Sequence, residues 1–213
     1  MSIATSEVQT TENAAVTPPR WHWYHAVAFY GAIQVLAFGL SGLVRLARGN
    51  RSQSLRKATL GDVSYFERHT QVKITPPSWA LGPAWLVNNV SVLWGTWLVL
   101  NKPQQTPGRA AYLALQGASW VDFVLFNAAY FSLRSPLNAL VLTFVMFLLT
   151  IASGMVAIFR LKDTKVTTSL ATLFTWLIVA LTAATFQALW NKDDFYQVGP
   201  FVEPRAGLVK KEA

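Results

Sequence analysis

Tryptophan is the residue type best suited to contact a bound molecule in this chain. There are nine tryptophans in 213 residues, and an indole offers a large flat apolar face and one N–H donor. Such side chains favour a planar apolar ligand, of which a tetrapyrrole is one example, although a membrane tryptophan can also be an interfacial anchor. Six lie in or beside three apolar segments: Trp79, Trp85, Trp94, Trp97, Trp120 and Trp176.

Asp122 is the only acidic residue well inside an expected helix. A carboxylate in a bilayer is costly and generally faces a cavity, a partner or a functional path. Asn88, Asn89, Gln116 and Asn127 are its candidate partners, and Asp122 together with the first three would orient the polar edge of a ligand. They are equally suited to interhelical hydrogen bonds that fix the packing.

Other chemistries find no support in the sequence. The chain has no cysteine, which excludes disulfides, iron–sulfur sites and thiol nucleophiles. His22, His25 and His69 are isolated, so they define no metal site, although a single imidazole can bind iron or magnesium axially. No HExxH sequence, phosphate loop or Ser-His-Asp set is found. We therefore expect binding or regulation rather than efficient catalysis, with no catalytic and no metal-ligating residues.

The elements that position these residues are expected to be membrane helices. Hydrophobic residues make up 53% of the chain and charged ones only 13%, against about 25% charged residues in soluble domains. Apolar windows of about 20 residues, the length that spans a bilayer core, recur. Because backbone groups in hydrocarbon must be paired within each segment, the sequence predicts an all-α integral membrane bundle of five transmembrane helices. These helices cover about residues 24–44, 81–100, 110–133, 137–159 and 167–190.

Basic residues predict the orientation of this membrane domain, residues 21–192. Of 18 Lys and Arg residues, twelve fall on the side of the first loop and the C-terminus, and six on the other side. The positive-inside rule then puts the N-terminus outside and the C-terminus in the cytoplasm. Residues 1–20 are expected to be a disordered tail without signal-peptide features, and residues 193–213 a cytoplasmic tail. In a membrane protein the position of each basic residue matters more than the net charge, here +8. We expect no nucleic-acid partner.

The loop between the first and second segments, about residues 45–80, is much longer than the other connections. Long loops in compact bundles are usually functional lids or disordered segments. Its first half is charged, whereas its second half contains Tyr65 and Phe66 and the paired prolines Pro76 and Pro77, which restrict the backbone. We predict that this second half holds one shape as a lid over the mouth of the bundle.

The sequence around the end of this loop resembles that of the translocator proteins. They are the TspO/MBR family of tryptophan-rich sensory proteins and peripheral benzodiazepine receptors. The signature of that family includes a Trp-Tyr pair, a Lys-Pro-x-Trp step, a Pro-Pro pair and a Trp in the first turns of the second helix. Pro76, Pro77 and Trp85 stand at matching spacing. Tyr65 and Phe66 replace the Trp-Tyr pair, and the Lys-Pro-x-Trp step is degraded.

The resemblance continues through the later segments, to about residue 192. Trp176 and Ala180 are four residues apart, as in the fifth helix of the family, and this spacing puts both on one helix face. Three positions depart from the family: Ser119 and Ala184 replace asparagines, and Leu142 replaces an acidic residue.

The resemblance implies five transmembrane helices, with a pocket beneath the first loop for a porphyrin, haem, (bacterio)chlorophyll-type tetrapyrrole or similar hydrophobic molecule. The resemblance also implies a sensory, regulatory or transport role. The catalytic activity that it implies is at most a slow photochemical breakdown of porphyrin. Trp85 and Trp176 would flank the ligand, and Ala180 would make room for it. The other expected contacts are Phe66, Pro76, Pro77, Asn89, Trp120 and Asp122.

A second interpretation comes from the departures from the family pattern. The chain would then be an accessory or structural subunit of a larger membrane complex, such as a pigment-containing photosynthetic one. Phe195, Tyr196 and Phe201 near the C-terminus would contact the partner. A homodimer is a further alternative, because small residues such as Gly39 and Gly42 allow close contacts between helices. A transporter with Asp122 as a proton relay is a third interpretation, although no inverted repeat is visible.

Overall fold

The computed structural model describes residues 20–49 and 63–210, where the regular elements are helices apart from two isolated β-bridges. The prediction of an all-α protein is therefore confirmed for these residues. Most of the expected N-terminal tail, the charged stretch 50–62 of the long loop, and residues 211–213 lie outside the described residues.

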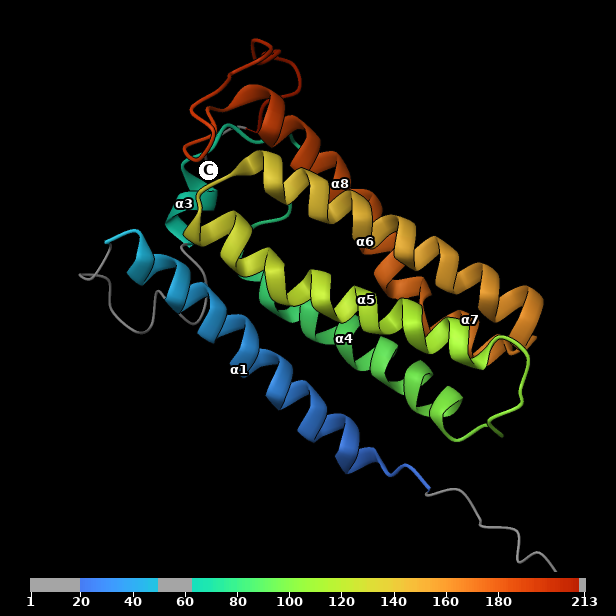
Figure 1. Ribbon diagram of the computed structural model, residues 1–213. Coiled ribbons are helices and arrows are strands. Elements are labelled where there is room, and N and C mark those ends of the chain that lie inside the picture. Colours follow the sequence, from blue (N-terminus) through green and yellow to red (C-terminus); the bar gives the residue numbers. More distant parts are fainter. Residues whose placement is uncertain (1–19, 50–62, 211–213) are drawn as a thin grey trace, which may run out of the picture.

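The long helices form a bundle in which successive helices run in opposite directions (Figure 1). The start of the first helix and the end of the last therefore lie at opposite ends of the bundle (Figure 1). The described elements are α1 (Trp23–Ala47), α3 (Val63–Glu67), α4 (Ser78–Leu100), α5 (Arg109–Asn127), the π-helical η1 (Ala128–Ser132), α6 (Pro136–Val156), the π-helical η2 (Ala157–Leu161), α7 (Thr164–Ser169) and α8 (Ala171–Trp190).

Among the described residues, three helical stretches are long and apolar enough to cross a membrane by length and composition: Trp23–Ala47, Pro136–Leu161 and Thr164–Trp190. Many large apolar side chains on the helices are also exposed, for example Val35 at 71% and Phe159 at 68%. A surface of this kind is suited to lipid rather than to water. An integral membrane protein is therefore supported, while the number of five crossings stays a prediction.

Helix ends differ from the predicted bounds for local reasons. Helix α4 begins at Ser78, because Pro77 has an extended backbone with ψ of 148° and ends the preceding loop. Pro83 lies inside the same helix near its start. The predicted segment 167–190 begins inside α7, and Leu170 separates that short helix from α8.

Polar contacts join α1 to η1 at one end of the bundle. The Ser41 and Ser132 hydroxyl oxygens are 2.6 Å apart, and the Arg45 Nε donates to the Ser132 hydroxyl at 3.2 Å. The Arg48 guanidinium donates to the Leu133 carbonyl at 2.7 Å. The last carbonyl groups of a helix have no partner within it, which leaves the Leu133 carbonyl at the end of η1 available to such a donor.

Two hydrophobic clusters make up the core. The larger one lies between the helices and includes the fully buried Tyr112, Val99 and Leu177. The smaller one contains Tyr65 and Phe66 of α3 packed with Tyr130 and Ala139. The loop segment that includes α3 is thus part of the packed structure.

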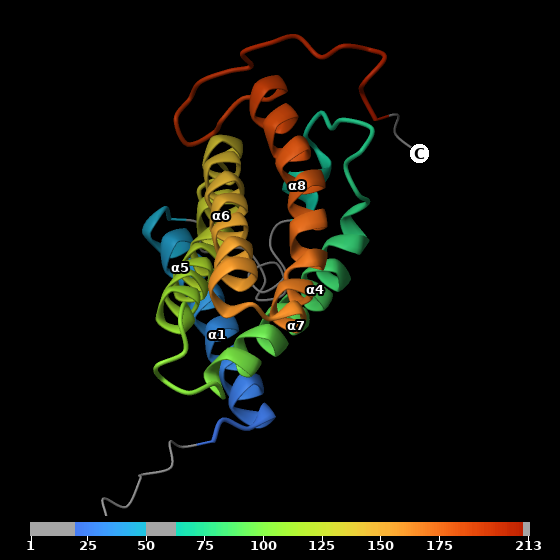
Figure 2. The same ribbon diagram turned by 90° about the vertical axis from the view of Figure 1, so that its right-hand side faces the viewer.

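The segment after α8 crosses the end of the bundle and contacts the first loop (Figure 2). We refer to residues 191–210 as the C-terminal strap and to residues 63–77 as the loop segment. The Lys73 N–H donates to the Leu208 carbonyl at 2.9 Å, and the Lys210 N–H donates to the Gln71 carbonyl at 2.8 Å. The Lys210 ammonium also donates to the Thr75 carbonyl at 3.1 Å.

The beginning of the C-terminal strap is fixed as firmly as its end. The Asn191 side chain bonds both backbone groups of Thr70, accepting from its N–H at 2.8 Å and donating to its carbonyl at 3.0 Å. The Asp193 carboxylate accepts from the Ser135 hydroxyl at 2.6 Å and from the Leu137 N–H at 3.1 Å, where α6 begins. The strap therefore ties α6 and the loop segment together.

Candidate binding cavity

A cavity of about 650 Å³ lies inside the bundle. This volume falls within the range of about 300–1,000 Å³ that is typical of ligand sites. Residues from α1, α4, α5, α6, α8, η1 and the loop segment contribute to it. The aromatic part of the lining consists of Tyr30, Phe38, Phe66, Trp79, Trp85, Phe123, Phe126, Tyr130, Phe131 and Trp176.

Two tryptophans and a phenylalanine form the aromatic wall of the cavity. The Trp85 ring centroid lies 5.6 Å from that of Phe123 and 6.4 Å from that of Trp176, with interplanar angles of 67° and 73°. Edge-to-face contacts of this kind are favourable for aromatic rings. The Trp176 Nε1 is buried and has no hydrogen-bond partner within the described ranges. One indole donor is thus left without an acceptor at this wall.

The small side chains of α8 leave space beside this wall. Ala180, Ala183 and Ala184 all line the cavity, and they follow Trp176 at helical spacings that keep them near one face. Gln187 continues this face toward the end of α8. The result is an apolar volume bounded by an indole at one end and an amide at the other.

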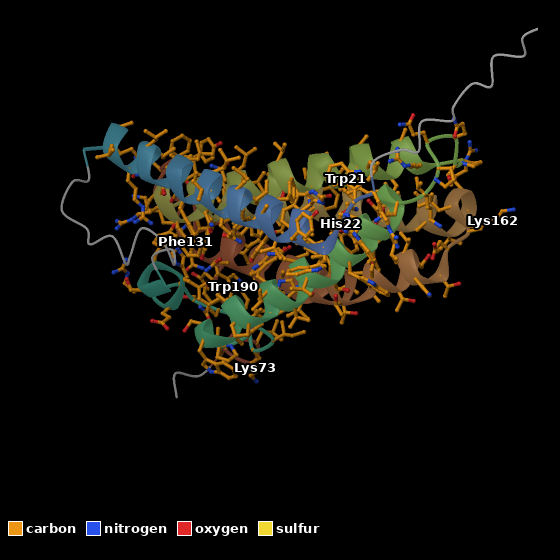
Figure 3. The ribbon with its side chains drawn as sticks, turned by 90° about the horizontal axis from the view of Figure 1, so that it is seen from below. Trp21, His22, Lys73, Phe131, Lys162 and Trp190 are labelled. Carbon is orange, nitrogen blue, oxygen red and sulfur yellow. The ribbon has the colours of Figure 1, made fainter. Side chains whose placement is uncertain are left out.

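The loop segment contributes residues to the cavity lining. Phe66, Thr75 and Pro76 belong to the lining. The Tyr65 ring, behind Phe66, lies 5.5 Å from the Tyr130 ring centroid and 4.3 Å from the His69 ring centroid. Figure 3 places Lys73 of this segment and Phe131 of η1 toward the same end of the bundle, away from Lys162.

Burial changes the pKa values of two side chains in the loop segment, Tyr65 and His69. Burial raises the pKa of the Tyr65 hydroxyl well above its usual value, and the carboxylates of Asp194 and Asp193 add to the effect. Burial likewise lowers the pKa of the His69 imidazole. The His69 Nδ1 lies 2.5 Å from the Tyr65 carbonyl oxygen, so this nitrogen carries the proton and donates. The Tyr65 and His69 side chains are therefore packed in their neutral forms at pH 7.

Two hydrogen bonds link polar side chains of the lining. The Tyr130 hydroxyl donates to the Gln187 side-chain oxygen at 2.9 Å. The Gln187 Nε2 has no acceptor among the residues that the structure describes. The Asn89 Nδ2 lies 3.4 Å from the Tyr30 hydroxyl, which is a weak contact. The lining thus retains donor capacity that a ligand can use.

Asp122 lines the cavity with a side chain that is only 5% exposed. No residue in the described parts of the chain forms a hydrogen bond or an ion pair with its carboxyl group. The described lining contains no lysine, arginine or histidine. The ionised form of a carboxyl group without a counter-charge is energetically costly in such an environment.

Seven of the nine predicted contact residues belong to the lining: Phe66, Pro76, Trp85, Asn89, Asp122, Trp176 and Ala180. Pro77 and Trp120 do not. Pro77 caps the start of α4. Trp120 lies 5.4 Å from the Phe29 ring and 6.3 Å from the Tyr30 ring, in the packing between α5 and α1. A ligand role for the seven residues stays a prediction.

The predicted polar cluster around Asp122 is only partly assembled. Asn89 shares the cavity lining with Asp122, but the Gln116 amide donates to the Ser153 hydroxyl at 2.9 Å and links α5 to α6. Asn88 lines a separate, shallow groove between α4 and α8, to which Trp176 also contributes. Consecutive positions on a helix point about 100° apart, which separates Asn88 from Asn89.

Sequence reasoning missed the Tyr130–Gln187 hydrogen bond and the role of Phe123 in the wall. A signal for Gln187 was present, because it lies on the same helix face as Trp176, Ala180 and Ala184. No comparable signal separates Phe123 from the neighbouring aromatic residues of α5.

Comparison with known protein families gives one match. The family model described as "TspO/MBR family" matches residues 35–191, which include every described residue of the cavity lining except Tyr30 and Gln34. No curated protein matches the chain.

Proposed function

Since the chain belongs to the TspO/MBR family, we propose that its cavity binds a tetrapyrrole or a similar hydrophobic ligand in a sensory, regulatory or transport role. The observation that carries the proposal is the aromatic-walled cavity of about 650 Å³ in the matched region. Apolar walls with a few polar groups are the usual composition of a ligand site. Binding rather than catalysis is the role we assign.

Named residues of the chain fit such a ligand. Trp85 and Trp176 supply flat apolar faces, and Ala180 leaves the space beside them. The Trp176 Nε1 and Gln187 Nε2 donors, unpaired among the described residues, suit the oxygen or nitrogen acceptors of a tetrapyrrole. Phe66 and Pro76 close the cavity, and in this proposal their segment acts as a lid.

The proposal includes five membrane crossings, by α1, α4, α5 with η1, α6 with η2, and α7 with α8. An odd number of crossings agrees with the opposite positions of the start of α1 and the C-terminal strap (Figure 1). By the positive-inside rule, the N-terminus is outside and the strap and the loop segment face the cytoplasm.

Protoporphyrin IX titration of the protein in lipid nanodiscs tests the proposal. Ala180→Phe places a ring in the cavity, so we expect protoporphyrin affinity, followed by porphyrin absorption, to fall at least tenfold. Ala110→Phe is the matched control, because Ala110 is exposed at the start of α5 and its substitution should leave affinity unchanged. Equal affinities for the two variants and the unmodified protein would remove the cavity as the site.

A second candidate function rests on the exposed aromatic residues of the C-terminal strap. Phe195, Tyr196 and Phe201 are 41%, 52% and 54% exposed, which suits an accessory subunit that contacts a larger membrane complex, such as a pigment-containing one. Gentle solubilisation followed by size analysis distinguishes the two. Co-purification with a large complex supports the second function, and a small species that takes up porphyrin supports the first.

A further inference from the structure

The described lining of the cavity is exposed along one face of helix α4. Its three exposed members are Trp79, Gly82 and Leu86, and Trp79 and Leu86 are 76% and 52% exposed. Their spacing of three and four residues puts them on one side of the helix. The described lining residues of α6, in contrast, are all buried. The cavity therefore reaches the surface of the bundle at this face of α4.

This face of α4 is directed toward α1. Asn89 lies on the same face as Leu86 and is 3.4 Å from the Tyr30 hydroxyl of α1. Because α1 and α4 run in opposite directions (Figure 1), Gln34, four residues after Tyr30, lies at about the level of Leu86. Phe38 lies one turn further toward the loop segment. Gln34 and Phe38 both line the cavity and are half-buried, so the opening lies between α1 and α4.

Hydrogen bonds hold α1 to α4 at one end of the bundle and α1 to η1 at the other. At the first end, the Trp97 indole and the Asn101 side chain both donate to the Trp21 carbonyl, at 2.8 Å and 3.0 Å. At the second end, α1 is bonded to η1 through Ser41 and the residues that follow it. Figure 3 shows that α1 (blue) and α4 (green) meet near Trp21 and diverge toward the end that carries Lys73.

A gap between the side chains of α4 forms the centre of the opening. A Cβ atom at Gly82 would meet no atom within 4 Å, although Trp79 and Leu86 flank this position on the same face. The five residues named at the opening carry no charge. Leu86 lies eight residues after Ser78, the start of α4, which is about 12 Å along the helix. In a hydrocarbon core about 30 Å thick, this depth lies within one leaflet.

We propose that the opening between α1 and α4 is a lateral portal, through which uncharged apolar molecules pass between the cavity and the lipid leaflet on the side of the loop segment. The inference goes beyond the proposed function, because it concerns entry to the cavity and not the identity of the ligand. It rests on that proposal in one respect, the crossing of the membrane by α1 and α4. Molecules that reach the cavity are then selected first by their solubility in lipid, which disfavours charged ones.

Thiol labelling tests the portal without any ligand. The chain has no cysteine, so Ala183→Cys places a single thiol on the α8 side of the lining. Lys162→Cys is the reference, at an exposed position between η2 and α7. N-phenylmaleimide and N-(4-carboxyphenyl)maleimide share a reactive group and differ by one carboxylate. In nanodiscs of zwitterionic lipid, we expect the preference for the uncharged reagent to be at least tenfold larger at Ala183→Cys than at Lys162→Cys.

Variants of the portal decide the route, since an apolar lining by itself also disfavours the charged reagent. In the Ala183→Cys protein, Gly82→Trp should slow labelling by N-phenylmaleimide at least tenfold, because the indole fills the gap. Gly117→Trp is the matched control, since Gly117 is also an exposed helical glycine with no atom within 4 Å of an added Cβ, and it should leave the rate within twofold. Leu86→Ala widens the portal and should accelerate labelling at least threefold.

The outcomes separate this inference from the proposed function. Slower labelling in Gly82→Trp with faster labelling in Leu86→Ala supports the portal. An unchanged rate in either variant, once thermal unfolding shows that it is folded, overturns the inference and leaves the proposed function standing. A thiol at Ala183→Cys that neither reagent reaches, or an equal preference at the two thiols, also overturns it. Failure of protoporphyrin IX to bind overturns the proposed function alone, because labelling requires no ligand.

Discussion

The aspartates of this chain show how the position of one residue type decides its role. Asp193 is fully buried, and its carboxylate accepts hydrogen bonds from the Ser135 hydroxyl and from three backbone N–H groups. Asp163 is at the surface, 2.7 Å from the Lys102 ammonium. Asp122 has neither kind of partner in the described structure. The first two contribute to stability, whereas the third lines the cavity.

Asp163 gives a prediction about stability and pH. Its Oδ1 accepts from the Lys165 and Val166 N–H groups and caps α7. Its hydrogen bond with Lys102 holds the pKa of this carboxyl below its usual value. Asp163→Ala should reduce the free energy of unfolding by about 1–2 kcal/mol, mostly through the lost cap. Asp163→Asn keeps the cap and should cost less than about 1 kcal/mol.

The sign of the pH effect follows from the lowered pKa. The ionised carboxyl stabilises the fold fully above its unfolded pKa of about 3.9 and loses this contribution as the pH falls through the lower folded value. Thermal unfolding in nanodiscs between pH 6 and pH 2.5 should therefore show an acid-induced loss that is smaller in Asp163→Asn. Identical pH profiles would contradict the assignment.

At the scale of elements, helix α4 approaches α7 closely at Gly95. A Cβ atom at this position would lie 1.9 Å from the Ser169 Oγ and 2.8 Å from the Ser169 Cβ. The Ser91 hydroxyl donates to the Ser169 carbonyl at 2.8 Å across the same contact. The absence of a side chain at Gly95 therefore sets the distance between the two helices.

Gly95→Ala should destabilise the protein by about 1–3 kcal/mol, because an added methyl group overpacks a filled site. Gly117→Ala is the control, since a Cβ there meets no atom within 4 Å and alanine favours a helix. Combining Gly95→Ala with Ser169→Gly removes the clashing atoms and should restore part of the loss. Thermal unfolding of the three variants measures these differences; a Gly95→Ala protein as stable as the control would show that the helices can separate at no cost.

At the scale of the whole molecule, hydrogen bonds join the C-terminal strap and the loop segment at one end of the bundle. The backbone of the loop segment contributes Gln71, Lys73 and Thr75 to hydrogen bonds with the strap. Each such bond stabilises by about 0.5–1.5 kcal/mol. These bonds therefore involve Gln71 and Lys73, which do not line the cavity, as well as Thr75, which does.

Removal of residues 199–213 should loosen the loop segment without unfolding the bundle, because Asn191 and Asp193 stay in place. We expect hydrogen exchange of the Lys73 N–H, which is bonded to the Leu208 carbonyl, to accelerate at least tenfold. Dissociation of bound protoporphyrin should accelerate as well. Lys210→Met is the milder variant, since it removes the ammonium bond to Thr75 and leaves the backbone bonds; unchanged exchange in the truncated protein would contradict a closing role.

The parts of the fold that sequence reasoning predicted are those with local signals. The apolar runs predicted helices, and the spacing of Trp176 and Ala180 placed both on the face that lines the cavity. The C-terminal strap had no such signal, because its contacts with the loop segment depend on residues 135 positions apart. Trp120 lies outside the lining, and its sequence neighbourhood does not show that Phe29 and Tyr30 pack against it.

The contact between Lys210 and Thr75 also fixes an order of events during biosynthesis. Gln187, the last residue of the lining, precedes Lys210 by 23 residues, which take roughly 1 to 5 s to translate at about 5–20 residues per second. During that interval every lining residue has been made, but the bonds between the strap and the loop segment have not. A hydrophobic molecule present in the membrane can therefore reach the cavity before the strap docks.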